Sequence, residues 1–270
     1  FKPREYQNLI INQILDKPRT AIWAGMGMGK TSSTLTALET MYLAGESRPT
    51  LVLAPLRVCN STWPEEAHKW AHLTEIDVQP VTGDEKNRLA ALKRDASIYA
   101  CNYQNIPWLV DHYGAHWPFG TVVADESTRL KSFRLRQGGV RAQALAKVAH
   151  KNVKRFINLT GTPAPNGLQD LWGQTWFLDA GQRLGRTYSA FTDRWFCRTA
   201  DGFGRELRSQ SAADEIYNKL RDICLTIEAR DWFDLKEPIV KEIEVEMPRS
   251  ARRLYDQLKK DLILQIEQHT

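Results

Sequence analysis

A glycine-rich segment near the start of the chain has the composition of a phosphate-binding loop. Residues 24–31 read AGMGMGKT, which fits the pattern GxxxxGKT with Ala24 in the first glycine position. Glycines let the backbone curl so that successive N–H groups point at phosphate oxygens, and the lysine neutralises their charge. The threonine supplies a hydroxyl for Mg²⁺. We therefore expect a nucleotide to be held by Gly25, Met26, Gly27, Met28, Gly29, Lys30 and Thr31.

Two adjacent carboxylates follow a second apolar segment. Residues 121–126 read TVVADE, so Asp125 and Glu126 stand where a strand would end. Ligands bind outside the carboxyl ends of parallel strands, where Asp125 could reach a Mg²⁺ held by Thr31. Glu126 could then polarise an attacking water as a general base. Lys30, Asp125 and Glu126 are accordingly the expected catalytic residues, with Thr31 and Asp125 as the Mg²⁺ ligands.

A third polar segment follows another apolar run. Residues 159–166 read LTGTPAPN, which places the hydroxyls of Thr160 and Thr162 at a strand end. Gly161 and Pro163 favour a tight turn between them and after them. Taken alone, this segment predicts only a turn.

The elements that must position these residues alternate along the first 160 residues. Residues 32–44 repeat Leu35, Leu38 and Tyr42 on one helical face before Gly45. Near-continuous apolar strands separated by such helices are typical of a parallel sheet covered on both faces, so we predict an α/β fold. The expected strands are residues 20–24, 50–54, 97–101, 121–124 and 155–159.

The later part of the chain has a different pattern. Residues from 166 to about 230 are mostly helical, and residues 241–247 alternate as a half-exposed strand would. Pro248 should end that strand, and Ser250 is a plausible N-cap for the last helix.

Composition limits the class of protein. The chain has 270 residues, a formal charge of +5, and 42% hydrophobic residues, as a globular protein does. We see no membrane-spanning run and no secretory signal. Four widely separated cysteines favour the cytoplasm, either bacterial or that of a host. The chain starts at Phe1 and stops inside a helical pattern, so we expect a fragment, and a monomeric one.

The order of these segments resembles that of superfamily-two helicases, and within them the Swi/Snf-type ATPases that move along double-stranded DNA. Further matching segments are PREYQ at residues 3–7, LVLAPLRVCNSTWPEEAHKW at 51–70, VTGDEKNR at 81–88 and NYQ at 102–104. DESTRLKS at 125–132 stands in the place of the family's DEAHRIKN.

The resemblance implies a P-loop RecA-like lobe with a helical protrusion. It implies that Gln7 reads adenine and that Thr160, Gly161 and Thr162 couple hydrolysis to movement of the lobes. It also implies nucleic-acid contacts at Arg57, Asn102 and Tyr103. The expected division is an ATP-binding lobe at 1–165, a helical protrusion at 166–235 and the start of a second lobe at 236–270.

Two departures from the family pattern stand out. Thr128 replaces the histidine that is thought to link the nucleotide site to the third motif, which leaves the coupling through Thr160 open. Pro3 and Glu5 replace residues that are more often Leu and Pro, which leaves Gln7 as the one strong match in that segment. Compact divergent forms of this kind are familiar from bacterial and phage genomes, so we expect such a source.

The positive charge is concentrated behind the carboxylate pair. Residues 127–169 contain nine Lys and Arg residues and no Asp or Glu, whereas the whole chain has 37 basic and 32 acidic residues. Such a stretch is either a solvated surface or a site for the phosphate backbone of nucleic acid. We select Arg134, Arg136 and Arg141 as DNA contacts.

These observations predict an ATP-dependent DNA translocase or helicase that hydrolyses ATP with Mg²⁺ in response to nucleic acid. Double-stranded DNA is the expected partner, and a second lobe is expected to supply the remaining motifs. The alternatives are an RNA helicase of the DEAD-box type and a nucleic-acid-binding module whose ATPase is vestigial.

Overall fold

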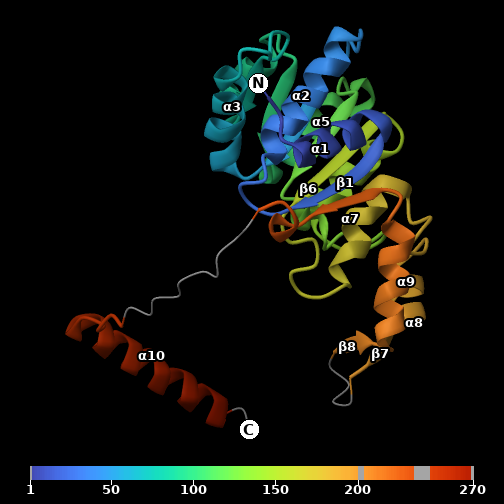
Figure 1. The fold of residues 1–270 in the computed structure, drawn as a ribbon. Coiled ribbons are helices and arrows are strands. Elements are labelled where there is room, and N and C mark those ends of the chain that lie inside the picture. Colours follow the sequence, from blue (N-terminus) through green and yellow to red (C-terminus); the bar gives the residue numbers. More distant parts are fainter. Residues whose placement is uncertain (1, 200–203, 234–243, 269–270) are drawn as a thin grey trace. The chain divides into compact units, whose positions relative to one another are not determined.

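The computed structural model describes residues 2–199, 204–233 and 244–268. Contacts divide the chain into two compact units, residues 1–233 and residues 234–270. Figure 1 shows the first unit as a central sheet with helices packed against it. None of the helices in the described part of the chain is long and apolar enough to cross a membrane.

The first unit is built on a seven-stranded sheet with the order β3-β4-β2-β5-β6-β1-β9, in which every neighbouring pair is parallel. Its strands are β1 (Arg19–Ala24), β2 (Thr50–Ala54), β3 (Val78–Val81), β4 (Ile98–Asn102), β5 (Thr121–Asp125), β6 (Arg155–Thr160) and β9 (Cys224–Ile227). The predicted α/β fold is confirmed, and the five expected strands are present. The sequence pattern missed β3 and β9 of this sheet, which have only four residues each and lie at its edges. It also missed a separate antiparallel pair, β7 (Phe196–Arg198) and β8 (Arg205–Leu207). Pro80 in β3 fits an edge, where a missing N–H does no harm.

Helices cover both faces of this sheet, because the strand side chains alternate between two hydrophobic layers. Ile22 and Val52 belong to the layer that includes α1, α2 and α3. Leu53 and Val122 belong to the layer that includes α5, α6 and α7. The helices of this unit are α1 (Glu5–Asp16), α2 (Lys30–Leu43), α3 (Trp63–Lys69), α4 (Glu85–Leu92), α5 (Ile106–Tyr113), α6 (Val140–Ala149), α7 (Asp170–Asp179), α8 (Tyr188–Trp195) and α9 (Gln210–Leu220).

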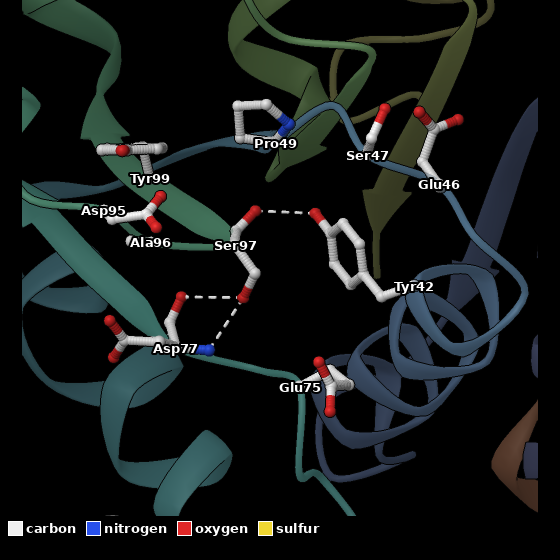
Figure 2. A pocket seen from close by; sticks show the side chains of 10 residues that line it. All are labelled: Tyr42, Glu46, Ser47, Pro49, Glu75, Asp77, Asp95, Ala96, Ser97 and Tyr99. Atoms are coloured by element: carbon white, nitrogen blue, oxygen red, sulfur yellow. Dashed lines mark hydrogen bonds between the residues drawn. The ribbon is translucent and has the colours of Figure 1, made fainter.

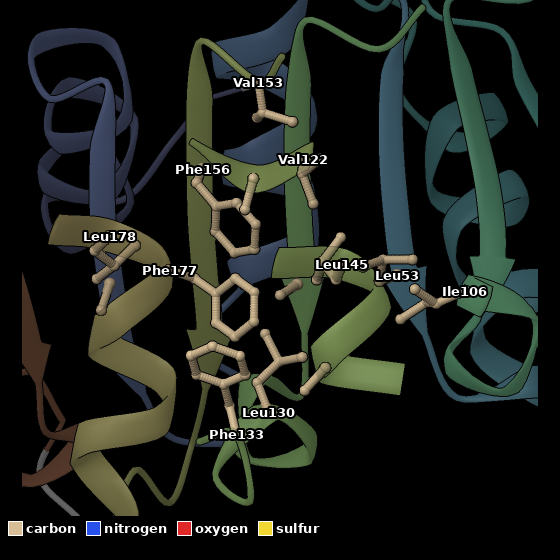
Figure 3. Packing of buried hydrophobic residues seen from close by; sticks show 14 of the residues in the cluster. Leu53, Ile106, Val122, Leu130, Phe133, Leu145, Val153, Phe156, Phe177 and Leu178 are labelled. Carbon is tan, nitrogen blue, oxygen red and sulfur yellow. The ribbon is translucent and has the colours of Figure 1, made fainter. Parts of the chain in front are cut away.

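Aromatic rings join α7 to the sheet in the second layer (Figure 3). The ring centroid of Phe177 lies 5.4 Å from that of Phe156 on β6 and 5.1 Å from that of Phe133. All three side chains are at most 2% exposed. The loop that carries Phe133 after β5 is therefore fixed to the same core as the strand that positions the carboxylate pair.

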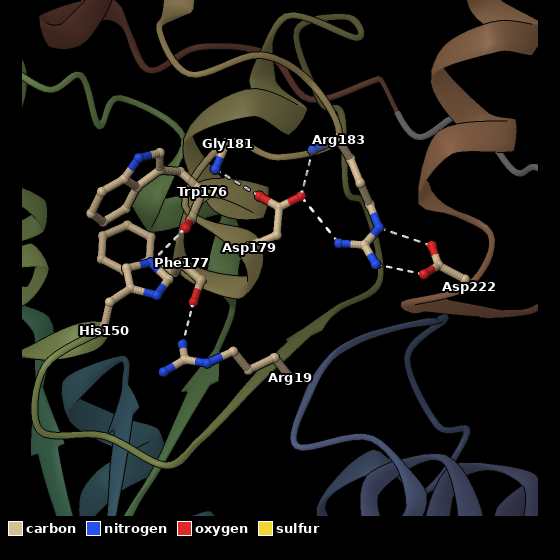
Figure 4. Close-up of polar contacts among 8 residues, drawn as sticks. All are labelled: Arg19, His150, Trp176, Phe177, Asp179, Gly181, Arg183 and Asp222. Carbon is tan, nitrogen blue, oxygen red and sulfur yellow. Dashed lines mark hydrogen bonds and ion pairs between the residues drawn. The ribbon is translucent and has the colours of Figure 1, made fainter.

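The helical segment between β6 and β9 is tied back to the sheet by polar contacts (Figure 4). Asp179, at the end of α7, accepts hydrogen bonds from the backbone N–H groups of Gly181 and Arg183. The Arg183 guanidinium pairs with Asp179 and, through two hydrogen bonds, with Asp222 just before β9. Arg19, at the start of β1, donates to the Phe177 carbonyl. The segment leaves the sheet after β6 and returns to it at β9, and these contacts hold both of its ends to the sheet.

The second unit contains α10 (Arg249–Gln268). This helix begins at Arg249, so Ser250 lies inside it and the expectation of an N-cap at Ser250 is wrong. Of the expected strand 241–247, residues 241–243 lie outside the described residues, and 244–247 have no regular secondary structure.

Candidate active site

The phosphate loop connects the carboxyl end of β1 to the start of α2. Gly27 and Gly29 have φ angles of 77° and 67°, a left-handed region that glycine adopts without strain. The Met28 side chain is only 2% exposed, whereas Met26 is 96% exposed. Met28 therefore anchors the loop in the core while Met26 faces solvent, and α2 begins immediately after the loop at Lys30.

The side chain of Gln7 lies against this loop. A Cβ atom added to Gly29 would come within 2.2 Å of Gln7 Nε2, so only a glycine leaves room for the amide where it stands. Gln7 Oε1 accepts a hydrogen bond from the backbone N–H of Arg4 at 2.9 Å, which orients the amide. The fold thus brings the Gln7 amide against the phosphate loop.

Aromatic residues from the far end of the first unit hold the helix that carries Gln7. The Tyr6 ring packs edge-on against Trp232 and Phe233, with centroid distances of 5.7 and 5.6 Å. The guanidinium of Arg4 lies over the Phe233 ring. Sequence reasoning missed this contact, since more than 220 residues separate its partners and neither segment shows a motif for it.

Lys30 is folded back onto the loop that precedes it. Its ammonium group donates to the carbonyl oxygens of Ala24 at 2.6 Å and Gly25 at 2.9 Å. Burial lowers the pKa of Lys30, and the charges of Asp125 and Glu126 raise it. The lysine therefore lies within electrostatic reach of the carboxylate pair, as a joint phosphate and metal site requires.

Asp125 is the last residue of β5, and two aromatic side chains donate hydrogen bonds to it. Its Oδ2 accepts a hydrogen bond from the indole Nε1 of the fully buried Trp63 at 2.9 Å. The Tyr103 hydroxyl donates to the Asp125 backbone carbonyl at 3.0 Å. Burial raises the pKa of Asp125, whereas the Trp63 hydrogen bond and the charge of Lys30 lower it. The carboxylate is thus fixed in direction and lies in an environment that favours a cation beside it.

Glu126 adopts a strained backbone conformation, with φ at 63° in the left-handed region that few residues other than glycine adopt. Its Oε1 accepts hydrogen bonds from the hydroxyls of Thr128 at 2.6 Å and Thr160 at 3.2 Å. The carboxylate is therefore joined directly to the turn that follows β6.

That turn packs against the phosphate loop. The backbone N–H of Thr162 donates to Thr160 Oγ1 at 3.1 Å. A Cβ atom added to Gly161 would lie 3.4 Å from the Ala24 carbonyl oxygen, so the two backbones run close together. The three sequence segments that we singled out for chemistry, the phosphate loop, the carboxylate pair and this turn, thus meet at the carboxyl ends of β1, β5 and β6.

The structure corrects two expected nucleic-acid contacts at the end of β4 and just after it. Tyr103 is 1% exposed and its hydroxyl is used by Asp125, so this side chain lies inside the protein. Asn102 is 7% exposed, and its amide bonds Gln104 and Asn105. Both side chains are therefore occupied within the fold, Tyr103 by the Asp125 carbonyl and Asn102 by its neighbours Gln104 and Asn105.

Arg134 is also engaged within the protein. Its guanidinium donates to the carbonyls of Lys131 and Phe133 and lies 3.4 Å from the centre of the Tyr188 ring. Arg134 is half-buried, so these contacts within the fold occupy part of the guanidinium that we expected at DNA. The other selected arginines, Arg57, Arg136 and Arg141, are exposed.

A separate hollow of about 410 Å³ lies beside the amino ends of β2, β3 and β4 (Figure 2). It is lined by the carboxylates of Glu46, Glu75, Asp77 and Asp95. The hydroxyl of Tyr42 donates to the Ser97 carbonyl at its wall. Four negative charges would repel a polyphosphate, so this hollow does not compete with the phosphate loop as a nucleotide site.

Comparison with known proteins places this geometry in a family. The SNF2-related domain family matches residues 19–270. Protein p41 of Acyrthosiphon pisum secondary endosymbiont phage 1 is 58% identical over 271 residues, which span 98% of this chain and 59% of p41. The Helicase SWR1 of Yarrowia lipolytica is 26% identical over 242 residues, which span 83% of this chain and 12% of the helicase. This chain thus spans about three fifths of the phage relative and a small part of the helicase.

Solved structures show the same fold. The SWI2/SNF2 ATPase core of Sulfolobus solfataricus in complex with double-stranded DNA matches with a TM-score of 0.66 and 24% identity, over 84% of this chain and 45% of that core. The phosphate loop, the carboxylate pair and the family match over nearly the whole chain agree, and the protein belongs to the SNF2-related domain family.

Proposed function

We propose that this chain is the ATP-binding lobe of a DNA-dependent ATPase that moves along double-stranded DNA. The observation that supports it most strongly is the convergence of Lys30 with Asp125 and Glu126 at one edge of the sheet. A lysine on a glycine-rich loop beside two carboxylates is the arrangement that phosphoryl transfer to water uses. The Sulfolobus core of the same fold is described as an ATPase core bound to double-stranded DNA, which supports the same assignment.

Each residue of the site has a role in this proposal. Lys30 would leave the carbonyls of Ala24 and Gly25 and pair with phosphate oxygens. The backbone of the phosphate loop, from Gly25 to Thr31, would hold the phosphates. Gln7 would read the adenine, and Glu126 would orient the attacking water.

The oxygen atoms of Thr31 and Asp125 suit a magnesium ion. Mg²⁺ prefers hard oxygen ligands such as hydroxyl and carboxylate groups. The Thr31 side chain is half-buried, and its hydroxyl makes no hydrogen bond to any described residue, so it is available. Mg²⁺, when bound, neutralises charge on the phosphates.

Nucleic acid would lie over the exposed arginines Arg57, Arg136 and Arg141. They fix position on a phosphate backbone without reading sequence, as a moving enzyme requires. We propose residues 1–165 together with β9 as the lobe, the helical segment between β6 and β9 as its protrusion, and residues 236–270 as the start of a second lobe. The chain corresponds to 45% of the Sulfolobus core, and turnover would need the part of such a core that this chain does not include.

The test is phosphate release by the full protein with double-stranded DNA, single-stranded DNA or RNA. We expect duplex DNA to raise turnover at least about tenfold, and Lys30→Ala to abolish it. Residues 1–270 alone should bind ATP weakly and hydrolyse it slowly. Stronger stimulation by RNA would favour an RNA helicase, and DNA binding without Lys30-dependent turnover would favour a binding module with a vestigial ATPase.

A further inference from the structure

The hydrogen bonds of Glu126 are unevenly distributed over its two carboxylate oxygens. Oε1 receives the Thr128 hydroxyl at 2.6 Å and the Thr160 hydroxyl at 3.2 Å. Within the described part of the chain, no hydrogen bond reaches Oε2. A carboxylate with one oxygen occupied by two donors has only the other oxygen available to a water molecule.

The backbone beneath this carboxylate is already fixed by other contacts. The next residue, Ser127, is fully buried, and its hydroxyl donates to Gln174 on α7 at 2.8 Å. The Tyr103 hydroxyl holds the Asp125 carbonyl just before it. The Thr128 hydroxyl is therefore not needed to hold this part of the chain in place. Both hydroxyls determine the direction of the Glu126 side chain, and the Thr160 hydroxyl also accepts the Thr162 N–H in its own turn.

The two hydroxyls come from different parts of the fold. Thr128 lies two residues after Glu126, in the short 3₁₀ turn Ser127–Leu130. Thr160 lies at the end of β6, and its own hydroxyl oxygen accepts the N–H of Thr162. A hydrogen-bonded chain therefore runs from the Thr162 backbone through Thr160 to Glu126, and Thr128 completes it from the other side.

We infer that Thr128 and Thr160 are positioning residues that hold Glu126 by Oε1 and so present Oε2 to the attacking water. This rests on the proposed ATPase function. The family has a histidine in the place of Thr128 and attributes the coupling to that residue. In this chain the coupling passes through the Glu126 carboxylate itself, because the Thr128 hydroxyl bonds it from one side and the Thr160 hydroxyl bonds it from the turn after β6. Movement of that turn changes the donor set of the general base directly.

The test compares ATP turnover by the full protein with duplex DNA in Thr128→Val, which removes the hydroxyl and keeps the shape, and in Thr128→Ser, which keeps the hydroxyl. We expect kcat to fall about tenfold or more in Thr128→Val and to recover to within about twofold of the parent in Thr128→Ser. The KM for ATP should change little, since neither hydroxyl is assigned to substrate binding. The melting temperature should also change little, because Tyr103 and Ser127 already hold the backbone on either side of Glu126. Thr40→Val is the matched control, because its hydroxyl bonds the Thr36 carbonyl on exposed α2 surface.

A double variant tests whether the two hydroxyls act on one group. If both act through Oε1, the loss in Thr128→Val with Thr160→Val should be smaller than the product of the two single losses. Independent, multiplying losses would overturn a shared role, and equal kcat in Thr128→Val and Thr128→Ser would overturn the role of the hydroxyl. Absence of any turnover that depends on Lys30 would instead overturn the proposed function, and this inference with it.

Discussion

Asp125 and Glu126 are neighbours in the chain, yet each carboxylate is held by a different set of donors. Trp63 donates to Asp125, and two threonine hydroxyls donate to Glu126. The strained φ of Glu126 separates the two directions. Adjacent carboxylates on an ordinary strand would point to opposite faces of the sheet, and the strained residue brings the second one back to the strand end.

Gly29 is the residue at which the phosphate loop meets the segment that carries Gln7, the proposed adenine reader. We predict that Gly29→Ala loses about 1–2 kcal/mol of unfolding free energy, because alanine is strained at φ 67°. The new methyl group would also meet Gln7 Nε2 and displace it. Preference for ATP over GTP should therefore fall, as it should in Gln7→Ala.

Gly27→Ala is the control for this prediction. Its φ of 77° carries the same strain, but nothing lies within 4 Å of the added Cβ atom. Thermal melting should show similar destabilisation in both variants, while calorimetric titration with ATP and GTP should show lost discrimination only in Gly29→Ala. An equal loss of discrimination in Gly27→Ala would contradict the contact with Gln7.

At the scale of elements, α3 supplies one hydrogen-bond donor to the carboxylate of Asp125, which we propose as a Mg²⁺ ligand. The segment Val58–Thr62 before it is a π-helix, a form often found at functional sites, and it brings the indole of Trp63 to Asp125. We predict that Trp63→Phe raises the Mg²⁺ concentration for half-maximal turnover several-fold. The lost donor lets the pKa of Asp125 rise further and leaves its carboxylate less fixed.

The matched control for Trp63 lies in α8. The indole of Trp195 donates to Glu215 at the same 2.9 Å, and its ring is 3% exposed. Trp195→Phe should cost similar stability, about 1–3 kcal/mol, without changing the Mg²⁺ dependence. Equal Mg²⁺ curves for the Trp63 variant and the parent protein would count against the assigned role.

The ion pair of Arg183 with Asp222 ties the helical segment to β9. The Arg183 hydrogen bond lowers the pKa of Asp222, so the pair contributes stability that is fully present above the ordinary aspartate pKa and is lost as pH falls through the lowered value. We predict that Asp222→Asn is less stable than the parent at pH 7. Its free energy of unfolding should fall by no more than about 1 kcal/mol, because the pair is partly exposed. The difference should close at pH 3 or below, and a constant difference across that range would exclude this origin.

The sequence predicts the positions of the site residues better than it predicts the contacts that hold them in place. The phosphate loop and the Asp125–Glu126 pair are contiguous motifs after apolar strands, so their place at the strand ends follows from a parallel sheet. Trp63 could not be assigned to Asp125, because 62 residues separate them and the strand order sets the contact. Tyr103 and Arg134 were expected to contact nucleic acid, because a motif and a charge count say nothing about burial or about contacts within the fold. Their true partners, a backbone carbonyl and an aromatic ring, come from distant segments.

At the scale of the whole molecule, the basic residues of the acid-free stretch 127–169 differ in what they contact. Lys131 pairs with Asp170, and Arg155 donates to the carbonyls of Ile14 and Leu15, so these charges serve the fold. Arg136 and Arg141 stay exposed in the loop after β5 and at the start of α6. The loop leaves the sheet at the carboxyl ends of the strands, the edge that also carries Lys30 and Glu126.

We predict that the double variant Arg136→Glu with Arg141→Glu weakens binding of duplex DNA. It should also reduce the slope of log affinity against log salt by about 2, one for each lost phosphate contact, while ATP affinity is retained. Lys17→Glu with Arg221→Glu makes the same charge change at exposed positions before β1 and β9, at the opposite edge of the sheet. If net charge alone governed binding, both double variants would lose affinity equally. The measurement is fluorescence anisotropy over a salt series. A larger loss for the arginine pair would place the DNA beside the carboxyl ends of the strands. There, one loop can link a phosphate backbone to the Glu126 carboxylate.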